Sequence, residues 1–125
     1  FVCIAGGLYP LAELAAVVGV PFKYLEELGG HVPVHNEAME TPVEGIYVAG
    51  NITGIESAKV AREQGKGAGL SIARKVTGNE DLAHKINEAI ANVKATREAA
   101  TIQFHPRIAE GRRKIAESFQ QQISL

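Results

Sequence analysis

The chain has 125 residues, of which 46% are hydrophobic and 22% charged, and its formal net charge is −1. These values are typical of one ordinary soluble globular domain, and they exclude the strongly basic surface of a nucleic-acid-binding protein. No apolar run approaches the ~20 residues of a membrane helix, so we expect no membrane span. The single cysteine, Cys3, excludes an internal disulfide and fits a cytoplasmic location.

The first residues predict a short strand, a glycine turn and a short helix. Phe1–Ala5 is an apolar run of strand length, in which Cys3 is expected as a small core side chain. Gly6-Gly7 ends this run. Pro10–Val18 predicts a helix, because proline is favoured in a first helical turn and apolar residues follow at helical spacing.

The next segment predicts two extended stretches around a glycine turn. Phe22–Leu25 can be extended, and Gly29-Gly30 marks a turn. His31–His35 alternates in polarity, but Pro33 restricts it to an edge strand or an extended loop. The four histidines of the chain show no metal-ligand or triad pattern, so we expect surface or loop histidines here.

The most informative stretch runs from Thr41 to Gly69 and reads TPVEGIYVAGNITGIESAKVAREQGKGAG. Ile46–Ala49 predicts a buried core strand, Gly50 allows a sharp bend, and Glu56–Val76 predicts a long helix. Asn51 stands between strand and helix with a short side chain that donates and accepts hydrogen bonds. A strand that delivers a polar residue to a helix N-terminus favours an anion or polyol site.

Three glycines interrupt the predicted long helix at Gly65, Gly67 and Gly69. Each one costs a helix interior up to ~1 kcal/mol relative to alanine, so their presence needs a reason. Close packing against a neighbouring element is one explanation, and close approach of a cofactor is the other.

The last part of the chain predicts helices only. Leu82, Ile86, Ile90 and Val93 form one apolar stripe in a helix from Glu80 to about Ala100, and His105-Pro106 marks a break. A final helix follows from Ile108, with Gly111 as a weak point. Within it, Arg112-Arg113-Lys114 is expected as a solvated helix face, with an anion or subunit contact as the alternative. We therefore divide the chain into an α/β part, residues 1–78, and a helical tail, residues 79–125.

Two segments of the α/β part resemble those of a known family. The pattern Thr-x3-Gly-Ile-Tyr-x-Ala-Gly-Asn, residues 41–51, resembles the second flavin fingerprint of the pyridine nucleotide–disulfide oxidoreductase-like flavoproteins, whose usual form ends in Gly-Asp. Within that superfamily it most resembles the α subunits of sarcosine oxidase and of dye-linked L-proline dehydrogenase. Phe1–Pro10 is similar to the strand and Gly-x-x-Pro turn that lead back from the nicotinamide domain to the flavin domain.

The resemblance implies a fold and a set of cofactor contacts. In the resembled family the region around Gly29-Gly30 returns towards the flavin domain, which favours an edge hairpin there. Residues 1–78 would be the C-terminal portion of the FAD-binding domain of a two-dinucleotide-binding-domain flavoprotein, and the helical tail would follow. Asn51 would bind a ribityl hydroxyl of FAD, and backbone N–H groups between Ile52 and Ala58 would face the flavin ring. The positions that would line the cofactor are Gly6, Gly7, Gly50, Asn51, Ile52, Ser57 and Ala58.

Each of these positions also has a purely structural interpretation. Asn51 can be a turn residue without a ligand, Ser57 and Thr53 can cap the following helix, and Gly6-Gly7 can form an ordinary tight turn. Glu56 is expected to be solvated, with a contact to a partner as the alternative. No residue is expected to act as a catalytic acid or base, and no metal site is expected.

The function that the resemblance implies is that of a C-terminal fragment of an FAD-dependent oxidoreductase subunit in an amine or amino-acid dehydrogenase complex. The chain lacks the Gly-x-Gly-x-x-Gly motif that holds the pyrophosphate, so we expect it to need a missing N-terminal part or other oxidoreductase subunits, and to bind no FAD alone. The alternative is a non-catalytic interaction subunit. In a homo-oligomer, Phe1–Ala5 and Ile46–Ala49 would pair with another copy.

Overall fold

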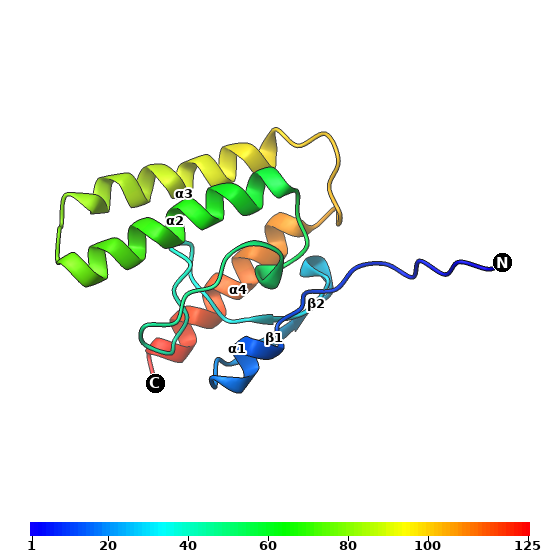
Figure 1. Cartoon of the computed structure of the whole chain (residues 1–125), viewed down its shortest axis with the longest axis horizontal. Helices are drawn as coiled ribbons and strands as arrows, with labels where there is room; N and C mark the ends of the chain where they lie inside the picture. Colours follow the sequence, from blue (N-terminus) through cyan, green and yellow to red (C-terminus); the bar gives the residue numbers. More distant parts are fainter.

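The computed structural model, which describes residues 1–125, contains four helices and one two-stranded sheet (Figure 1). The expectation of a mixed α/β fold is confirmed, while its assignment to a flavin domain stays a prediction. The elements in chain order are α1 Glu13–Val17, β1 Phe22–Leu25, the 3-10 turn η1 Glu26–Leu28, β2 Gly30–Pro33, the 3-10 turn η2 Gly50–Thr53, α2 Ala58–Thr77, α3 Leu82–Glu98 and α4 Ile108–Ile123.

The two strands form the predicted hairpin. β1 pairs with β2 in antiparallel register, with Phe22 opposite Pro33 and Leu25 opposite Gly30. The connection is the turn η1 followed by Gly29, whose φ of 93° lies in the left-handed region that favours glycine. Pro33 lies in β2 of this two-stranded sheet, where both strands are edges, as expected for a residue without a backbone N–H.

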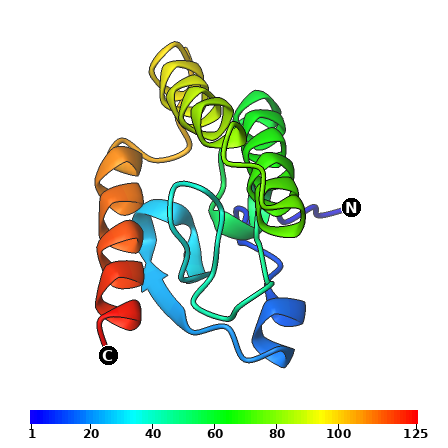
Figure 2. The same ribbon diagram turned by 90° about the vertical axis from the view of Figure 1, so that its left-hand side faces the viewer.

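The main hydrophobic core lies between this hairpin and α4. Figure 2 shows α4 running beside the strands, so the end of the chain packs on its first third. The core residues are Leu25, Leu28, Val32, Val34, Ile108, Ile115 and Phe119. Gly111, expected as a weak point of the helix, is where α4 comes closest: a Cβ added there would lie 2.8 Å from the Glu27 Cβ. The glycine is therefore needed for this contact.

A second layer is formed by α2 and α3, which lie side by side and are joined by the short turn after Thr77 (Figure 1). The predicted helices are confirmed here. A Cβ added to Gly67 would lie 3.8 Å from the Cβ of Ala89, so this glycine packs against α3. Cβ atoms added to Gly65 and Gly69 would meet nothing within 4 Å. The packing explanation therefore holds for Gly67 and gives no reason for the other two glycines.

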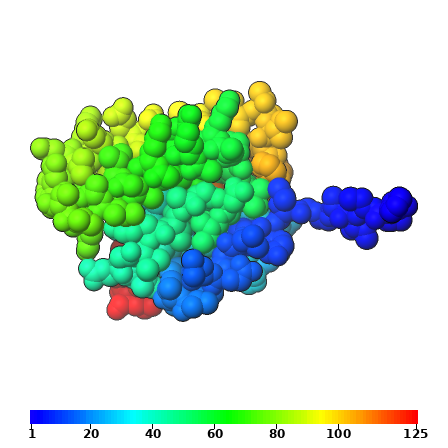
Figure 3. All heavy atoms as spheres, viewed as in Figure 1, coloured from blue at the N-terminus to red at the C-terminus, as the bar shows by residue number.

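Both predicted core strands outside the hairpin are wrong. Phe1–Ala5 has no secondary structure and no neighbouring strand to bond to, and it extends away from the body of the protein (Figure 3). Cys3 is consequently exposed rather than part of a core. Ile46–Ala49 forms no strand either: Tyr47 makes one isolated bridge with Glu40, because only the short segment before it offers backbone partners.

The helix predicted at Pro10–Val18 is confirmed, but it is shorter than expected and spans only Glu13–Val17, as α1. Its apolar face lacks a covering partner, since the side chains of Leu14 and Val17 are 77% and 81% exposed. None of the four helices combines the length and apolar character that crossing a membrane requires.

Candidate functional site

The bend that the sequence singles out connects the loop at Ala49 to the start of α2. Gly50 has a φ of 82°, which turns the chain sharply. Its N–H donates to the Gln64 Oε1 at 3.0 Å, and its carbonyl accepts from the Thr53 hydroxyl at 2.7 Å. Thr53 and Gln64 are both buried, so the bend is fixed against the first turns of α2. The N–H of Ile55 donates to the Leu28 carbonyl and joins the bend to the hairpin.

The structure presents the predicted cofactor residues of this bend unequally. Asn51 is exposed, and Gly50 and Ile52 are half-buried beside it. Ser57 is half-buried, and its hydroxyl accepts from the Val60 N–H at 3.3 Å, so it caps α2 as the structural interpretation expects. Ala58 is exposed in the first turn of α2, where backbone N–H groups have no acceptor within the helix.

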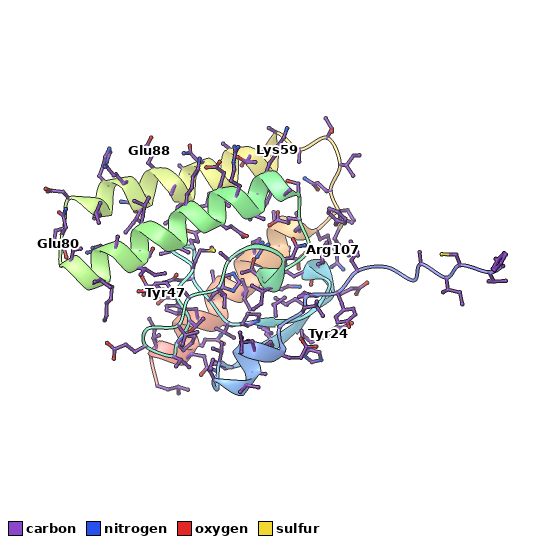
Figure 4. All side chains as sticks on the ribbon, viewed as in Figure 1. Tyr24, Tyr47, Lys59, Glu80, Glu88 and Arg107 are labelled. Atoms are coloured by element: carbon purple, nitrogen blue, oxygen red, sulfur yellow. The ribbon has the colours of Figure 1, made fainter.

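Lys59 also lies in this first turn, and Figure 4 shows it at the N-terminal end of α2. The bend therefore offers an exposed amide and free N–H donors on a buried support. Thr53 does not cap α2, because its hydroxyl is used inside the bend. That a flavin contacts these groups stays a prediction.

Gly6 and Gly7 lie on the exposed N-terminal segment, where an added Cβ would meet nothing within 4 Å. The segment reaches the bend just after them. A Cβ added to Gly29 would lie 3.7 Å from the Leu8 carbonyl oxygen, 3.5 Å from the Pro10 Cδ and 3.1 Å from the Ile55 Cγ1. The structure thus places Leu8 and Pro10 near Ile55 of the bend, at the hairpin turn.

A buried ion cluster connects the bend to α3 and α4. Arg97 Nε donates to Glu56 Oε1 at 2.5 Å, and Arg112 Nη2 donates to Glu56 Oε2 at 2.5 Å. Arg112 Nη1 also donates to the Thr53 carbonyl at 2.6 Å. The expectation of a solvated Glu56 and a solvated Arg112 is wrong, because α3 and α4 both deliver a guanidinium to this carboxylate.

The two arginines decide the charge state of Glu56. Burial raises the pKa of the Glu56 carboxyl, but the hydrogen bond from Arg97 and the charge of Arg112 outweigh burial and hold the pKa below its ordinary value. The carboxylate is therefore charged at neutral pH. No sequence pattern points to the cluster, since Arg97 and Arg112 lie 41 and 56 residues after Glu56.

A cleft of about 790 Å³ opens between α3 and α4, with residues 35–39 and Gln64 along its base. None of the predicted cofactor residues lines it. His35 lines it and is only 2% exposed, so the expectation of a surface or loop histidine is wrong at this position. The His35 Nδ1 lies 2.7 Å from the carbonyl oxygen of Pro33, the last residue of β2. The packing of this strand therefore holds the imidazole inside the protein.

No three histidine, cysteine or carboxylate side chains lie close enough together to hold a metal ion. Comparisons with protein-family models, with curated proteins and with solved structures find no match for this chain. Its function must therefore be argued from its own residues.

Proposed function

We propose that this chain is the C-terminal part of the FAD-binding domain of an FAD-dependent oxidoreductase subunit, in an amine or amino-acid dehydrogenase complex of the sarcosine or L-proline type. The observation that carries the proposal is the bend at residues 50–58. It combines the fingerprint-like sequence with an exposed Asn51 and with the free N–H donors of a 20-residue helix.

The chemistry of this bend suits the polar side of a flavin. The Asn51 amide can exchange hydrogen bonds with neutral ribityl hydroxyls, which do not require a carboxylate. The N–H groups at Ala58 and Lys59, together with the helix dipole, would favour the partial negative charge on the pyrimidine oxygens of the ring. Bound FAD would supply the redox chemistry, and these residues would bind and orient it without acting as acid or base.

The N-terminal third exposes large apolar side chains, and this supports the idea that another protein domain or subunit covers them. Phe1, Ile4, Leu14 and Val17 are between 77% and 132% exposed, and they follow one another along the chain. Several large apolar side chains exposed within one segment of the chain favour an interaction site there. The rest of the flavoprotein, or another subunit of the complex, would occupy it.

The test uses the complete gene product, with whatever is encoded upstream of Phe1. It should purify with the absorption bands of a flavin, and Asn51→Ala should weaken FAD binding about 2- to 10-fold, as expected for one lost hydrogen bond. Asn87→Ala is the matched control, because Asn87 is exposed on α3 away from the bend. A product that stays colourless after incubation with FAD would overturn the proposal.

The colourless outcome would favour the alternative function of a non-catalytic interaction subunit. The same exposed apolar residues would then be its binding surface. In that case Leu14→Ser should release the chain from its complex, which size-exclusion chromatography with mass detection would show.

A further inference from the structure

The cleft between α3 and α4 has the composition of a ligand site. Its volume of about 790 Å³ lies in the range of pockets that bind small organic molecules. Its apolar wall includes Val93 from α3 and Ile108 and Ile115 from α4, and all three are buried. Such a wall suits the apolar body of a ligand.

Two polar groups on nearly fully buried residues are left free in this cleft. Gln64 uses its Oε1 to accept from Gly50 and Thr53, while its Nε2 has no protein partner. His35 uses Nδ1 on the Pro33 carbonyl, while its Nε2 has none. No polar side-chain atom that is closed off from solvent lacks a partner, so both free nitrogens keep contact with solvent. Because both residues line the cleft and are 2% exposed, the cleft is where that contact is made.

The charge behind the cleft is positive. Arg97 and Arg112 share the single carboxylate of Glu56, which leaves one positive charge in excess among these buried groups. Arg97 donates through Nε and Nη2 to Glu56, and its Nη1 has no protein partner. At the rim, the Lys94–Glu37 and Arg113–Glu117 pairs are neutral, and the Glu98 carboxylate is exposed.

The protonation of His35 fixes its role. Burial, with a smaller contribution from the charges of Arg112 and Arg97, lowers the pKa of the imidazole to about 4 despite the hydrogen bond to the Pro33 carbonyl. The ring is therefore neutral near pH 7, and because Nδ1 carries the proton that is donated to Pro33, Nε2 is an acceptor.

We propose that this cleft binds a small hydroxylated organic carboxylate with an apolar body. The carboxylate accepts from Arg97 Nη1 and Gln64 Nε2, the hydroxyl donates to His35 Nε2, and the body lies on the wall formed by Val93, Ile108 and Ile115. The site is separate from the flavin-facing bend and does not require the proposed function. Gln64 joins the two, since it binds Gly50 on one side and lines the cleft on the other.

The probe is 3-phenyllactate, added to the isotope-labelled 125-residue chain and followed by NMR at the Gln64 amide and the His35 ring. A ligand of this size is expected to bind with a Kd on the order of 1 mM. Removing the hydroxyl, in 3-phenylpropanoate, should weaken binding about 2- to 10-fold. Replacing the carboxylate by an amide, in 3-phenyllactamide, should weaken it by more than about tenfold.

Two substitutions place the ligand in the cleft. Ala116→Phe fills the cleft from α4 and should abolish the shifts, whereas Ala91→Phe, on the exposed face of α3, should leave them unchanged. Ala109→Phe, at an exposed position of the rim, serves as the blocking variant if Ala116→Phe fails to fold. The proposal is overturned if 3-phenyllactate produces no saturable shift, if the amide binds equally well, or if the folded blocking variant still binds.

Discussion

Neutralising Glu56 is the change that tests the buried ion cluster most directly. Glu56→Gln keeps the size of the side chain but leaves Arg97 and Arg112 without their only carboxylate partner. The two arginine side chains are 14% and 12% exposed, so water can screen them only in part. Removing one partner of a buried ion pair costs about 3–5 kcal/mol. Because Arg97 keeps some contact with solvent, we expect a loss near the lower end, about 3 kcal/mol of the free energy of unfolding.

Urea denaturation followed by circular dichroism measures this loss, and an exposed ion pair provides the matched control. Glu44 pairs with Lys75 at 2.9 Å, with side chains 83% and 58% exposed. Exposed pairs contribute little to stability, so Glu44→Gln should change the unfolding free energy far less than Glu56→Gln does. Equal effects of the two substitutions would refute the reasoning, since they would mean that Glu56 is as well solvated as Glu44.

Two further predictions concern His35 and the glycines of the helices. The pKa of His35 is about 4 in the folded chain, against an ordinary 6.5 in the unfolded chain. Between these two pH values the unfolded chain therefore binds more protons than the folded chain. The free energy of unfolding should thus have its full value above pH 6.5 and fall by about 3 kcal/mol as the pH is lowered to 4. Urea midpoints between pH 6.5 and 5 measure the slope, and the difference between the original chain and His35→Gln gives the part that His35 contributes, because the carboxylates titrate alike in both. Gly111→Ala should destabilise the protein by roughly 1–3 kcal/mol, because the new Cβ would lie 2.8 Å from the Glu27 Cβ. Gly65→Ala should stabilise it by up to ~1 kcal/mol, because a Cβ there meets nothing within 4 Å. Thermal unfolding of the two variants measures both effects, and a change of the same sign in both would contradict the packing argument.

The elements that could be predicted from the sequence are those whose signal is local. Helix periodicity around Ile86 and Val93 predicted α3, and the glycine turn at Gly29 with the Pro33 restriction predicted the turn and the extended stretches on either side of it. In each case the residues that form the element also carry the pattern. The position of the bend at Gly50 could be predicted for the same reason, because a glycine with positive φ marks it.

The two strands that were wrong, Phe1–Ala5 and Ile46–Ala49, show the limit of this reasoning. An apolar run of strand length indicates that a segment can pair, but the pairing partner must come from elsewhere in the fold. The ion cluster could not be predicted from the sequence for a related reason. Glu56 and Arg112 each look like ordinary surface charges, and only the crossing of α4 over the bend turns them into a buried pair.

The helical tail therefore does more than extend the α/β part. Arg112 of α4 donates to the Thr53 carbonyl inside the bend and binds the carboxylate of Glu56 just after it, while Arg97 of α3 binds that carboxylate from its other oxygen. Thr53 and Glu56 lie on either side of Gly54 and Ile55, all of them buried, and the exposed Asn51 precedes them. The bend is therefore held by residues from both helices of the tail. If FAD binds at Asn51 as proposed, it meets a surface that Arg97 and Arg112 of the tail support from behind, so substitutions at these arginines should also affect its binding.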